Sequence, residues 1–278
     1  MTPAVHVTHP DKVLFPRDGI TKREFVEYYR RIAGVMLPHL RGRAIAMERY
    51  PDGIGGPRIF QKNASAYFPE WVKTVALKKQ GGTVRHVVCD DADTLAYLAN
   101  QAVITPHTWL SRVDKPDRPD QMIFDLDPPE GQFREVCATA KRLRELLKDA
   151  GLTAFVKTTG SRGLHVLAPL KRRKTFDEVR AWARQIAEEL VHDNPKRLTL
   201  EIRKNKRGRR IFVDTARNAY AQTAAPAYAV RARDGAPVAA PIEWKELDRP
   251  GLRPDQFNIR NIFERLESVG DLWKGAVA

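Results

Sequence analysis

The segment from residue 121 to residue 215 alternates between the two-residue hydrophobic period of strands and the three-to-four-residue period of helices. Helices are predicted at Phe133–Asp149 and from the capping residue Thr175 onward. The predicted strands are Gln121–Asp127, Thr153–Lys157, Leu164–Leu170 and Arg210–Thr215. A chain with this order of elements packs helices on a sheet, which predicts an α/β (α+β) fold.

The flanking parts of the chain predict further elements around this segment. A helix is predicted from Thr21 to Met36, because Thr21 and Glu24 can form a capping box and Pro38 closes the pattern. Another helix is predicted from Ala92 to about residue 103, and short strands and turns lie between the two. No linker divides the chain, so we predict one unit over residues 1–278, bilobed, with a catalytic part at roughly 121–220.

Charge gives the first indication of a partner. The chain of 278 residues has 48 Lys and Arg against 34 Asp and Glu, a formal net charge of +14 at pH 7. A field of this sign attracts polyanions, of which nucleic acid is the commonest. One basic cluster lies between Lys196 and Arg217 and another at Lys171–Lys174, both beside apolar patterns, so we expect them on a folded surface. The charge alone also fits a merely well-solvated surface.

Cysteine content and hydropathy exclude several classes of protein. Two cysteines, Cys89 and Cys137, without a Cys-x-x-Cys pair, exclude a disulfide scaffold and a thiolate zinc site. No apolar run approaches the roughly 18 residues that a membrane span needs. The first residues lack the basic and apolar stretches of a secretory signal. We therefore expect a cytoplasmic protein without a membrane partner.

Three aspartates are candidates for metal chemistry. Asp125 and Asp127 lie two residues apart on a predicted strand, so both side chains leave the same face. Adjacent carboxylates favour a hard divalent cation such as Mg²⁺ or Mn²⁺. Asp214 ends another strand, and two-metal phosphoryl transfer needs acids that converge on ions about 3.5–4 Å apart. The alternatives are solvated acids before Pro128 and an arginine partner for Asp214.

A glycine-containing turn, Thr159–Gly163, separates two predicted strands and is followed by His165. Glycines let backbone N–H groups approach an anion, and the hydroxyls of Thr159 and Ser161 add donors. Arg162 and His165 add charge. The turn is therefore a candidate for holding a triphosphate, although such turns also join strands that bind nothing.

These segments together resemble the polymerase domain of bacterial DNA ligase D, within the archaeo-eukaryotic primase superfamily. The central motifs of the resemblance are Met122–Pro129, Thr158–Val166 and Arg210–Asp214 with the following Arg217 and Asn218. The flanking motifs are His9–Pro16 with Thr21 and Lys22, and Tyr228–Arg231 with Gly235–Val238. Because the motifs are ordered along nearly the whole chain, the resemblance is specific.

The resemblance implies a primase-polymerase fold with central mixed or antiparallel sheets, flanking helices and an RRM-like catalytic part. It implies a template-dependent nucleotidyltransferase of bacterial non-homologous end joining or gap repair, which prefers ribonucleotides among NTP and dNTP substrates and uses two Mn²⁺ or Mg²⁺ ions. The implied partners are DNA with a gap, overhang or double-strand break and a 5′-phosphate, a Ku-like end-binding protein and a DNA ligase. The implied location is the bacterial nucleoid.

The resemblance also implies a role for individual residues. The implied metal ligands are Asp125, Asp127 and Asp214. The implied nucleotide-binding residues are Thr159, Ser161, Arg162, His165 and Arg207. The implied DNA contacts are Lys12 and Lys22 at a 5′-phosphate, Phe60 stacking on template bases, Arg49 in a loop facing the primer terminus, and His107 and Arg231 in active-site assembly and template contact.

Three positions depart from the family pattern. Ile59 stands where a second aromatic residue is common, Glu48 replaces a usual basic residue, and Thr159 replaces a usual serine while keeping the hydroxyl. Read without the resemblance, the DNA contacts have simpler alternatives: surface charges for Lys12 and Lys22, a core position for Phe60 and a structural role for His107.

Two other functions compete with the polymerase. A haloacid-dehalogenase-like phosphatase would use Asp125 as nucleophile and Asp127 as acid and base. That class needs a later acidic pair, for which Gly270-Asp271 is a poor substitute, and its strand is not followed by Pro128-Pro129. The other competitor is a non-catalytic nucleic-acid-binding module, against which the presence of all three aspartates argues.

Overall fold

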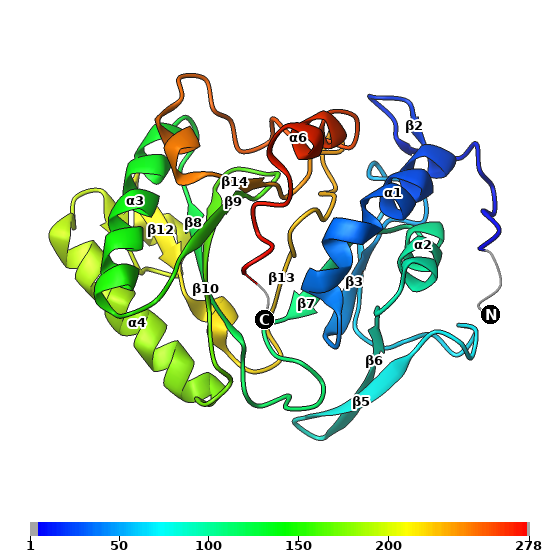
Figure 1. The fold of residues 1–278 in the computed structure, drawn as a ribbon, viewed down its shortest axis with the longest axis horizontal. Helices are drawn as coiled ribbons and strands as arrows, with labels where there is room; N and C mark the ends of the chain where they lie inside the picture. The colour runs from blue at the N-terminus through cyan, green and yellow to red at the C-terminus, as the bar shows by residue number, and fades with distance from the viewer. Residues whose placement is uncertain (1–4, 277–278) are drawn as a thin grey trace.

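Two six-stranded sheets lie between two pairs of helices in the computed structural model, which describes residues 5–276 (Figure 1). In the first sheet every pairing is antiparallel except the parallel edge pair β11–β12. Its strands, in spatial order, are β11 (Leu198–Thr199), β12 (Ile211–Asp214), β8 (Gln121–Asp127), β10 (Leu164–Pro169), β9 (Phe155–Thr158) and β14 (Pro241–Ile242).

The first sheet contains a β-α-β-β-α-β unit. Along the chain β8 is followed by α3 (Phe133–Asp149), β9, β10, α4 (Phe176–Asp193) and β12, and the strands lie in the order β12-β8-β10-β9. This is the four-stranded arrangement of RRM-like folds. The predicted α/β (α+β) class and the RRM-like part are therefore confirmed.

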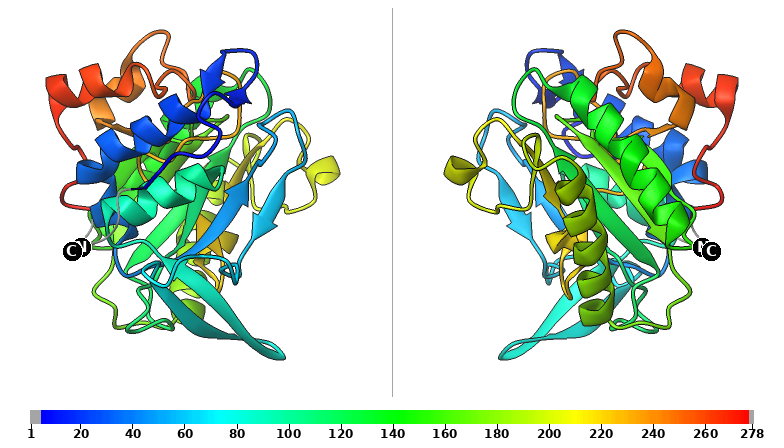
Figure 2. Two further views of the ribbon diagram at one scale, coloured as in Figure 1. Left: turned by 90° about the vertical axis from the view of Figure 1, so that its right-hand side faces the viewer. Right: turned by 90° about the vertical axis from the view of Figure 1, so that its left-hand side faces the viewer.

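Helices α3 and α4 cover one face of this sheet and leave the other face free for chemistry (Figure 2). Met122, Phe124 and Leu126 of β8 are fully buried in the core beneath the two helices, where burial of each side chain is worth about 1.5–3 kcal/mol. Since side chains alternate along a strand, Asp125 and Asp127 leave the opposite face. Both predicted helices therefore position the acids by burying their neighbours.

The second sheet lies on the free side of the first (Figure 1). Helices α1 (Lys22–Leu40) and α2 (Ala92–Asn100) pack on it through a separate hydrophobic core. Its strands, in spatial order, are β13 (Thr223–Ala224), β7 (Val103–Trp109), β3 (Ala44–Arg49), β6 (Gly82–Val88) and β5 (Thr74–Lys79), with β4 (Ile59–Gln61) paired to β3.

A buried ion pair links the two sheets at the points where β3 and β8 begin. Arg43, just before β3, donates from Nη1 and Nη2 to both oxygens of Asp120, just before β8, at 2.6 and 2.7 Å. A two-pronged contact of this kind fixes orientation as well as distance.

The remaining elements are β1 (Val13–Phe15), β2 (Ile20–Thr21), α5 (Lys204–Arg207), η1 (Ala216–Asn218), η2 (Trp244–Asp248) and α6 (Ile262–Val269).

The expected end of the first helix was wrong. Helix α1 continues through Pro38 to Leu40, and the Arg41 N–H still donates to the Leu37 carbonyl at 2.9 Å. Proline in the last turn removes one N–H but leaves this closing bond intact. Within the described residues, no helix is both long and apolar enough to cross a membrane.

Candidate active site

Four polar residues form a row across the first sheet. The register pairs Asp214 with Asp125 between β12 and β8, and Asp125 with His165 between β8 and β10. It then pairs His165 with Lys157 between β10 and β9. Because directly paired residues share a face of the sheet, all four side chains leave the face opposite α3 and α4. Two predicted acids from distant parts of the sequence are thereby neighbours.

Asp125 is held in its ionised form. Burial raises the pKa of this carboxyl, but His165 together with the charges of Arg217 and Arg231 outweighs burial and lowers the pKa to about 2. Its side chain is 24% exposed, and Oδ1 lies 3.5 Å from His165 Nε2. The row therefore carries a fixed negative charge at its centre.

Asp214 has the opposite electrostatic environment. Burial raises the pKa of its carboxyl, and the neighbouring negative charge of Asp125 raises it further. The Ala216 N–H, which donates to Oδ1 at 2.7 Å, and the charge of Arg217 act against this increase. Two carboxylates that repel each other on a partly buried face are stabilised by a cation placed between them.

Asp127 faces arginines in place of the other acids. Arg162 Nη2 donates to Oδ1 and Oδ2 of Asp127 at 3.1 and 3.2 Å, and Arg207 Nη1 lies 3.8 Å from Oδ2. Arg207 is itself fixed, because Nε donates to the Glu201 carbonyl at 2.8 Å and its guanidinium lies 3.7 Å from the Phe212 ring centroid. Two predicted nucleotide-binding arginines thus meet a predicted metal ligand.

The three aspartates suit a divalent ion chemically, but the structure does not gather all three. An all-carboxylate donor set matches Mg²⁺ or Mn²⁺, and the repulsion between Asp125 and Asp214 marks where a cation fits best. Asp127 is engaged by arginine, and in the described part of the chain no group of three or more His, Cys, Asp or Glu is arranged to hold a metal ion. The three-aspartate metal site stays a prediction.

The turn between β9 and β10 depends on two glycines. A Cβ at Gly163 would lie 1.9 Å from the Leu126 carbonyl oxygen, so only glycine lets the turn approach β8 this closely. Gly160 has φ +63°, and a Cβ there would lie 2.9 Å from Arg231 Cγ. The turn is thereby pressed against the strand that carries Asp125.

The predicted triphosphate-binding turn is closed by its own threonine. Thr159 Oγ1 donates to the Gly163 carbonyl at 3.1 Å and accepts from the Gly163 N–H at 3.2 Å. Arg231 Nη1 donates to the Thr159 carbonyl at 3.0 Å. Arg162 and the half-buried Ser161 are the members of the turn that reach solvent.

His165 and Lys157 form a buried pair. Lys157 Nζ lies 2.9 Å from His165 Nδ1, and the two residues are 1% and 5% exposed. Burial, reinforced by the charge of Lys157, lowers the pKa of His165 to about 4 against the pull of Asp125. Burial and the charge of Arg231 lower the pKa of Lys157 to about 7. At neutral pH the imidazole is therefore neutral beside an ionised carboxylate.

A cavity of about 300 Å³ lies beside the middle of this row and is lined from both sheets. Asp125 and His165 line it from the first sheet, Phe60 and His107 line it from the second, and Arg231 lies against it. Phe60 is 40% exposed and packs edge-on against the His107 ring at 5.5 Å, so the alternative of a core position is excluded. Three predicted DNA contacts therefore share a cavity with a predicted metal ligand.

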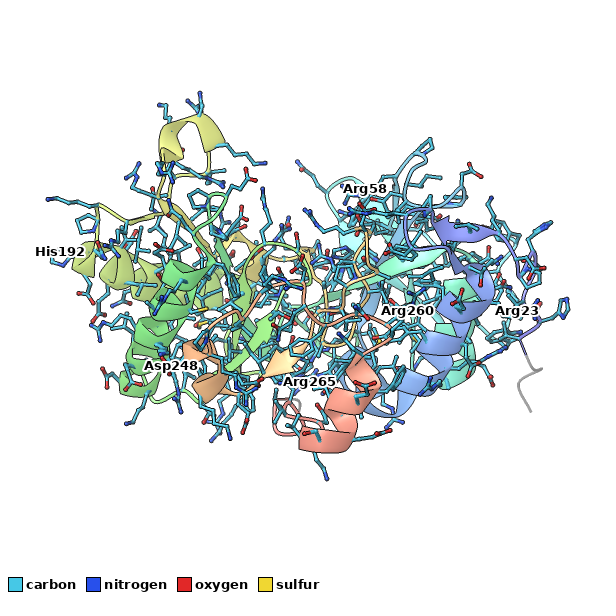
Figure 3. The ribbon with its side chains drawn as sticks, turned by 90° about the horizontal axis from the view of Figure 1, so that it is seen from above. Arg23, Arg58, His192, Asp248, Arg260 and Arg265 are labelled. Atoms are coloured by element: carbon cyan, nitrogen blue, oxygen red, sulfur yellow. The ribbon has the colours of Figure 1, made fainter. Side chains whose placement is uncertain are left out.

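Glu48 organises the wall from the second sheet. It accepts from Arg58 Nε at 2.7 Å and lies 3.0 Å from His107 Nε2. Burial raises the pKa of Glu48, but His107, Arg58 and Arg231 outweigh burial and lower the pKa to about 2. Figure 3 shows Arg58 on the side of the molecule from which α5 also projects. The acid that departs from the family pattern thus holds two cavity residues in place.

Lys12 and Lys22 lie outside this cavity, next to the start of α1. Lys12 Nζ contacts Asp52 Oδ1 at 2.9 Å, and Lys22 Nζ donates to Thr8 Oγ1 at 2.9 Å. Lys22 is 7% exposed, and burial together with the charge of Lys12 lowers its pKa to about 8. The Lys22 N–H donates to the Lys12 carbonyl at 2.8 Å, so the two lysines are neighbours, and their contact with a 5′-phosphate stays a prediction.

Arg49 is not in a loop as expected. It is the last residue of β3, because pairing with both β4 and β7 extends the strand to this position. Its guanidinium donates to the Gln101 carbonyl at 3.0 Å, to Gln61 Oε1 at 2.8 Å and to the Tyr67 hydroxyl at 3.1 Å. Three partners fix the Arg49 side chain at the end of β3.

Several residues of the site were not predicted from the sequence. Lys157 sits in a predicted strand without any mark of function, and Arg58 lies in a loop-like stretch. Arg217 belongs to a motif that carried the resemblance, and this position was the available signal.

The basic cluster Lys171–Lys174 lies away from the site, and three of its residues line a separate cavity of about 490 Å³ at the opposite ends of β9 and β10.

The first sheet is RRM-like, carries the paired acids Asp125 and Asp214, and borders a cavity that arginines line. These features together define an α/β domain of primase-polymerase type. The sequence model of the family described as LigD, primase-polymerase domain, matches residues 21–273. The chain belongs to this family. The competing haloacid-dehalogenase class is thereby excluded, and Asp271 of its required acidic pair instead accepts from the Tyr228 hydroxyl at 2.6 Å.

Relatives and a solved structure agree with this assignment. The multifunctional non-homologous end joining protein LigD of Mycolicibacterium smegmatis is 34% identical over 96% of the chain, and that of Pseudomonas aeruginosa is 33% identical over 98%. The bifunctional protein LigD of Bacillus subtilis is 31% identical over 96%. The aligned parts are 35%, 33% and 43% of these relatives, so the chain spans well under half of their length.

A solved structure is similar to the chain over the same share of its length as these relatives. The polymerase domain from Mycobacterium tuberculosis ligase D, solved in complex with DNA, has a TM-score of 0.93 and 33% identity. The match covers 98% of this chain and 97% of that one. The fold of the chain is therefore that of a LigD polymerase domain over nearly its whole length.

Proposed function

We propose that the chain is a template-dependent nucleotidyltransferase that fills gaps and extends ends in bacterial non-homologous end joining. The observation that carries the proposal is the direct pairing of Asp214 with Asp125, which lines a cavity that both sheets share. Arg217 and Arg231 place positive charge around the acids, which is what a triphosphate and a primer terminus require. The names of the relatives and the DNA bound to the solved neighbour support DNA as the substrate.

Asp125 and Asp214 would hold a divalent ion, Mn²⁺ or Mg²⁺, and Asp127 would complete the site for two ions. Bound divalent ions supply charge neutralisation and a more acidic primer 3′-hydroxyl. Asp127 becomes available only when Arg162 leaves it, and a triphosphate offers that guanidinium a more highly charged partner. Nucleotide entry and completion of the metal site are then linked through one side chain.

The nucleotide would lie against the turn between β9 and β10. Arg162 and Arg207 flank Asp127 and can turn their guanidinium groups to phosphate oxygens. Ser161 offers a hydroxyl from the same turn, and Thr159 keeps the turn closed. His165 lines the cavity beside Asp125 and would donate from Nε2 to the substrate.

The DNA would approach from the second sheet. The partly exposed Phe60 offers an aromatic ring on which a template base would stack, and the His107 ring packs against it at 5.5 Å. Arg231 links the turn to the cavity, and Arg49 would face the primer from the end of β3. Lys12 and Lys22 would bind the 5′-phosphate on the far side of a gap.

The proposal includes the finer properties that the family resemblance implies. These are a preference for ribonucleotides, cooperation with a Ku-like end-binding protein and a DNA ligase, and a location at the bacterial nucleoid. The relatives named as non-homologous end joining proteins support the pathway.

Extension of a gapped duplex tests the proposal. The protein is incubated with Mn²⁺, a primer annealed across a short gap, and either ribonucleotides or deoxynucleotides, with a 5′-phosphate or 5′-hydroxyl downstream end. The expected result is templated addition that is faster with ribonucleotides and with the phosphate. Binding of the duplex without any addition, under both metals and both nucleotide classes, would contradict it and favour a non-catalytic binding module.

A further inference from the structure

Lys157 is a basic side chain in a position where charge is costly, and burial with the charge of Arg231 lowers its pKa to about 7. It is 1% exposed on β9, and its hydrogen bond goes to an imidazole nitrogen, His165 Nδ1, at 2.9 Å. Removing an ammonium group from water costs several kcal/mol unless strong partners replace the water. A neutral ring nitrogen replaces it only in part, so packing alone does not explain a lysine here.

Within the described part of the chain, the surroundings of Lys157 supply no stronger partner. The Trp273 ring centroid lies 5.9 Å from Nζ, and the nearby His39 is neutral because burial lowers its pKa to about 4. Arg231 repels the ammonium group, whereas Asp125 attracts it from across His165. Among residues 5–276, the one hydrogen-bond partner of Nζ is therefore His165.

That contact decides which nitrogen of His165 carries the proton. A neutral imidazole has one N–H donor and one acceptor nitrogen, and an ammonium group can only donate. When Lys157 Nζ donates to Nδ1, the Nδ1 atom accepts and Nε2 carries the hydrogen. The Asp125 carboxylate on the other side of the ring, which can only accept, favours the same arrangement. Nε2 lies 3.5 Å from Asp125 Oδ1, and both residues line the cavity.

The other tautomer would place a lone pair where a donor is needed. With hydrogen on Nδ1, Nε2 would present its lone pair to the Asp125 carboxylate and to any phosphate oxygen in the cavity. Both are negatively charged acceptors, so this contact would be repulsive. The position of a single hydrogen thus decides whether His165 attracts or repels the substrate.

We propose that Lys157 is a positioning residue that holds His165 as the Nε2–H tautomer and so turns a donor toward the nucleotide. The inference rests on the proposed nucleotidyl transfer for its kinetic consequence, but not for the tautomer itself. Residues behind a functional imidazole commonly set its tautomer and orientation, and their loss typically costs about 10–100-fold in activity. Lys157 acts through His165 and does not touch the substrate.

The tautomer is measured first, in a way that is independent of activity. Protein labelled with ¹⁵N in histidine is compared as wild type and as Lys157→Met, which keeps an unbranched side chain of nearly the same length and removes its donors. The ring nitrogens of His165 are assigned by their loss in His165→Phe. We expect Nε2–H in the wild type and a mixture of tautomers in Lys157→Met. A wild-type His165 protonated on Nδ1 would overturn the proposal.

Stability separates a positioning role from a structural one. Replacing a buried charge by an apolar side chain of similar shape is often neutral or stabilising. We therefore expect Lys157→Met to melt at the wild-type temperature or above it while nucleotide addition falls about 10–100-fold. Affinity for the gapped duplex should not change. Lys141→Met, the same replacement at an exposed position on α3, is the matched control and should leave every readout unchanged.

A double substitution closes the test. In a His165→Phe background, adding Lys157→Met should cost no further activity, because the lysine acts only through the imidazole. A further loss of tenfold or more in the double variant would overturn the proposal, as would full activity in Lys157→Met. If the wild type adds no nucleotide at all, the proposed function fails, while the tautomer measurement still decides the role of Lys157.

Discussion

Asp125 on β8 and Asp214 on β12 occupy directly paired positions on one face of a sheet, and burial together with the charge of Asp125 raises the pKa of Asp214. The pairing brings together two carboxylates that lie 89 positions apart in the sequence. A divalent ion would stabilise the pair. Asp127 lies on the same face but is held by Arg162. Two acids of the site are therefore paired, and the third is bound to an arginine.

Arg162 should affect both nucleotide and metal. Arg162→Met removes the partner of Asp127 and a candidate phosphate contact, so the KM for nucleotide should rise about tenfold or more. Binding of Mn²⁺ without nucleotide should become tighter, because Asp127 is released. Single-turnover nucleotide titration and calorimetry with Mn²⁺ measure the two effects. Arg162→Lys keeps the charge without the two-pronged geometry, so its KM and its Mn²⁺ affinity should lie between those of the wild type and Arg162→Met. An unchanged KM in Arg162→Met would contradict the assignment.

Gly163 should tolerate no side chain. A Cβ at this position would lie 1.9 Å from the Leu126 carbonyl oxygen, so Gly163→Ala must displace the turn from β8. We expect a loss of more than about 2 kcal/mol in the free energy of unfolding, measured with urea. The KM for nucleotide should rise as well, since the same turn carries Arg162.

Gly34 provides the matched control for that substitution. It lies inside α1, and a Cβ there would meet nothing within 4 Å. Gly34→Ala should therefore stabilise the protein by about 1 kcal/mol, because alanine is the better helix former. Equal effects of the two glycine substitutions would show that the close approach at Gly163 is unimportant.

The sequence predicted the acidic face of the first sheet because a strand has a simple period. Alternation in Gln121–Asp127 buries Phe124 and Leu126 under the helices, which by itself directs Asp125 and Asp127 to the other side. The capping boxes at Thr21 and Thr175 are also local patterns, and both are formed.

The rest of the site depends on contacts that no local pattern encodes. Lys157 looks like a solvated strand residue until β9 pairs with β10 and places it behind His165. The pairing of Asp127 with Arg162 likewise depends on how the turn folds back on β8. Strands of two residues, such as β14, are too short to show a period, and β14 becomes a strand only by pairing with β9.

The 5′-phosphate preference should depend on pH through Lys22. Burial and the charge of Lys12 lower the pKa of Lys22 to about 8, so the ammonium form is present below that value and is lost as pH rises through it. The ratio of extension on 5′-phosphate to 5′-hydroxyl gaps should therefore fall between pH 7 and pH 9. Lys22→Arg stays charged throughout and should give a flat ratio. A wild-type ratio that does not change with pH would contradict this role.

Glu48 should make the protein acid-sensitive. Its pKa is about 2 against a usual value of 4.5, so the ionised form stabilises the fold above pH 4.5 and the stabilisation is lost as pH falls toward 2. This difference corresponds to about 3 kcal/mol. Glu48→Gln should be less stable than the wild type at pH 7, and the difference between their urea unfolding curves should shrink steadily from pH 4.5 as pH falls toward 2. A constant difference across that range would rule out Glu48 as the cause.

Replacement of Asp125 tests the central claim most directly. In Asp125→Asn the side chain keeps its shape and loses the charge that, with Asp214, would hold a divalent ion. Mn²⁺-dependent addition of one nucleotide to a gapped duplex should fall more than about 100-fold, while affinity for the duplex stays within about twofold of the wild type. Retained addition would show that the chemistry lies elsewhere, and an equal loss of addition and binding would show that Asp125 serves the fold rather than the reaction.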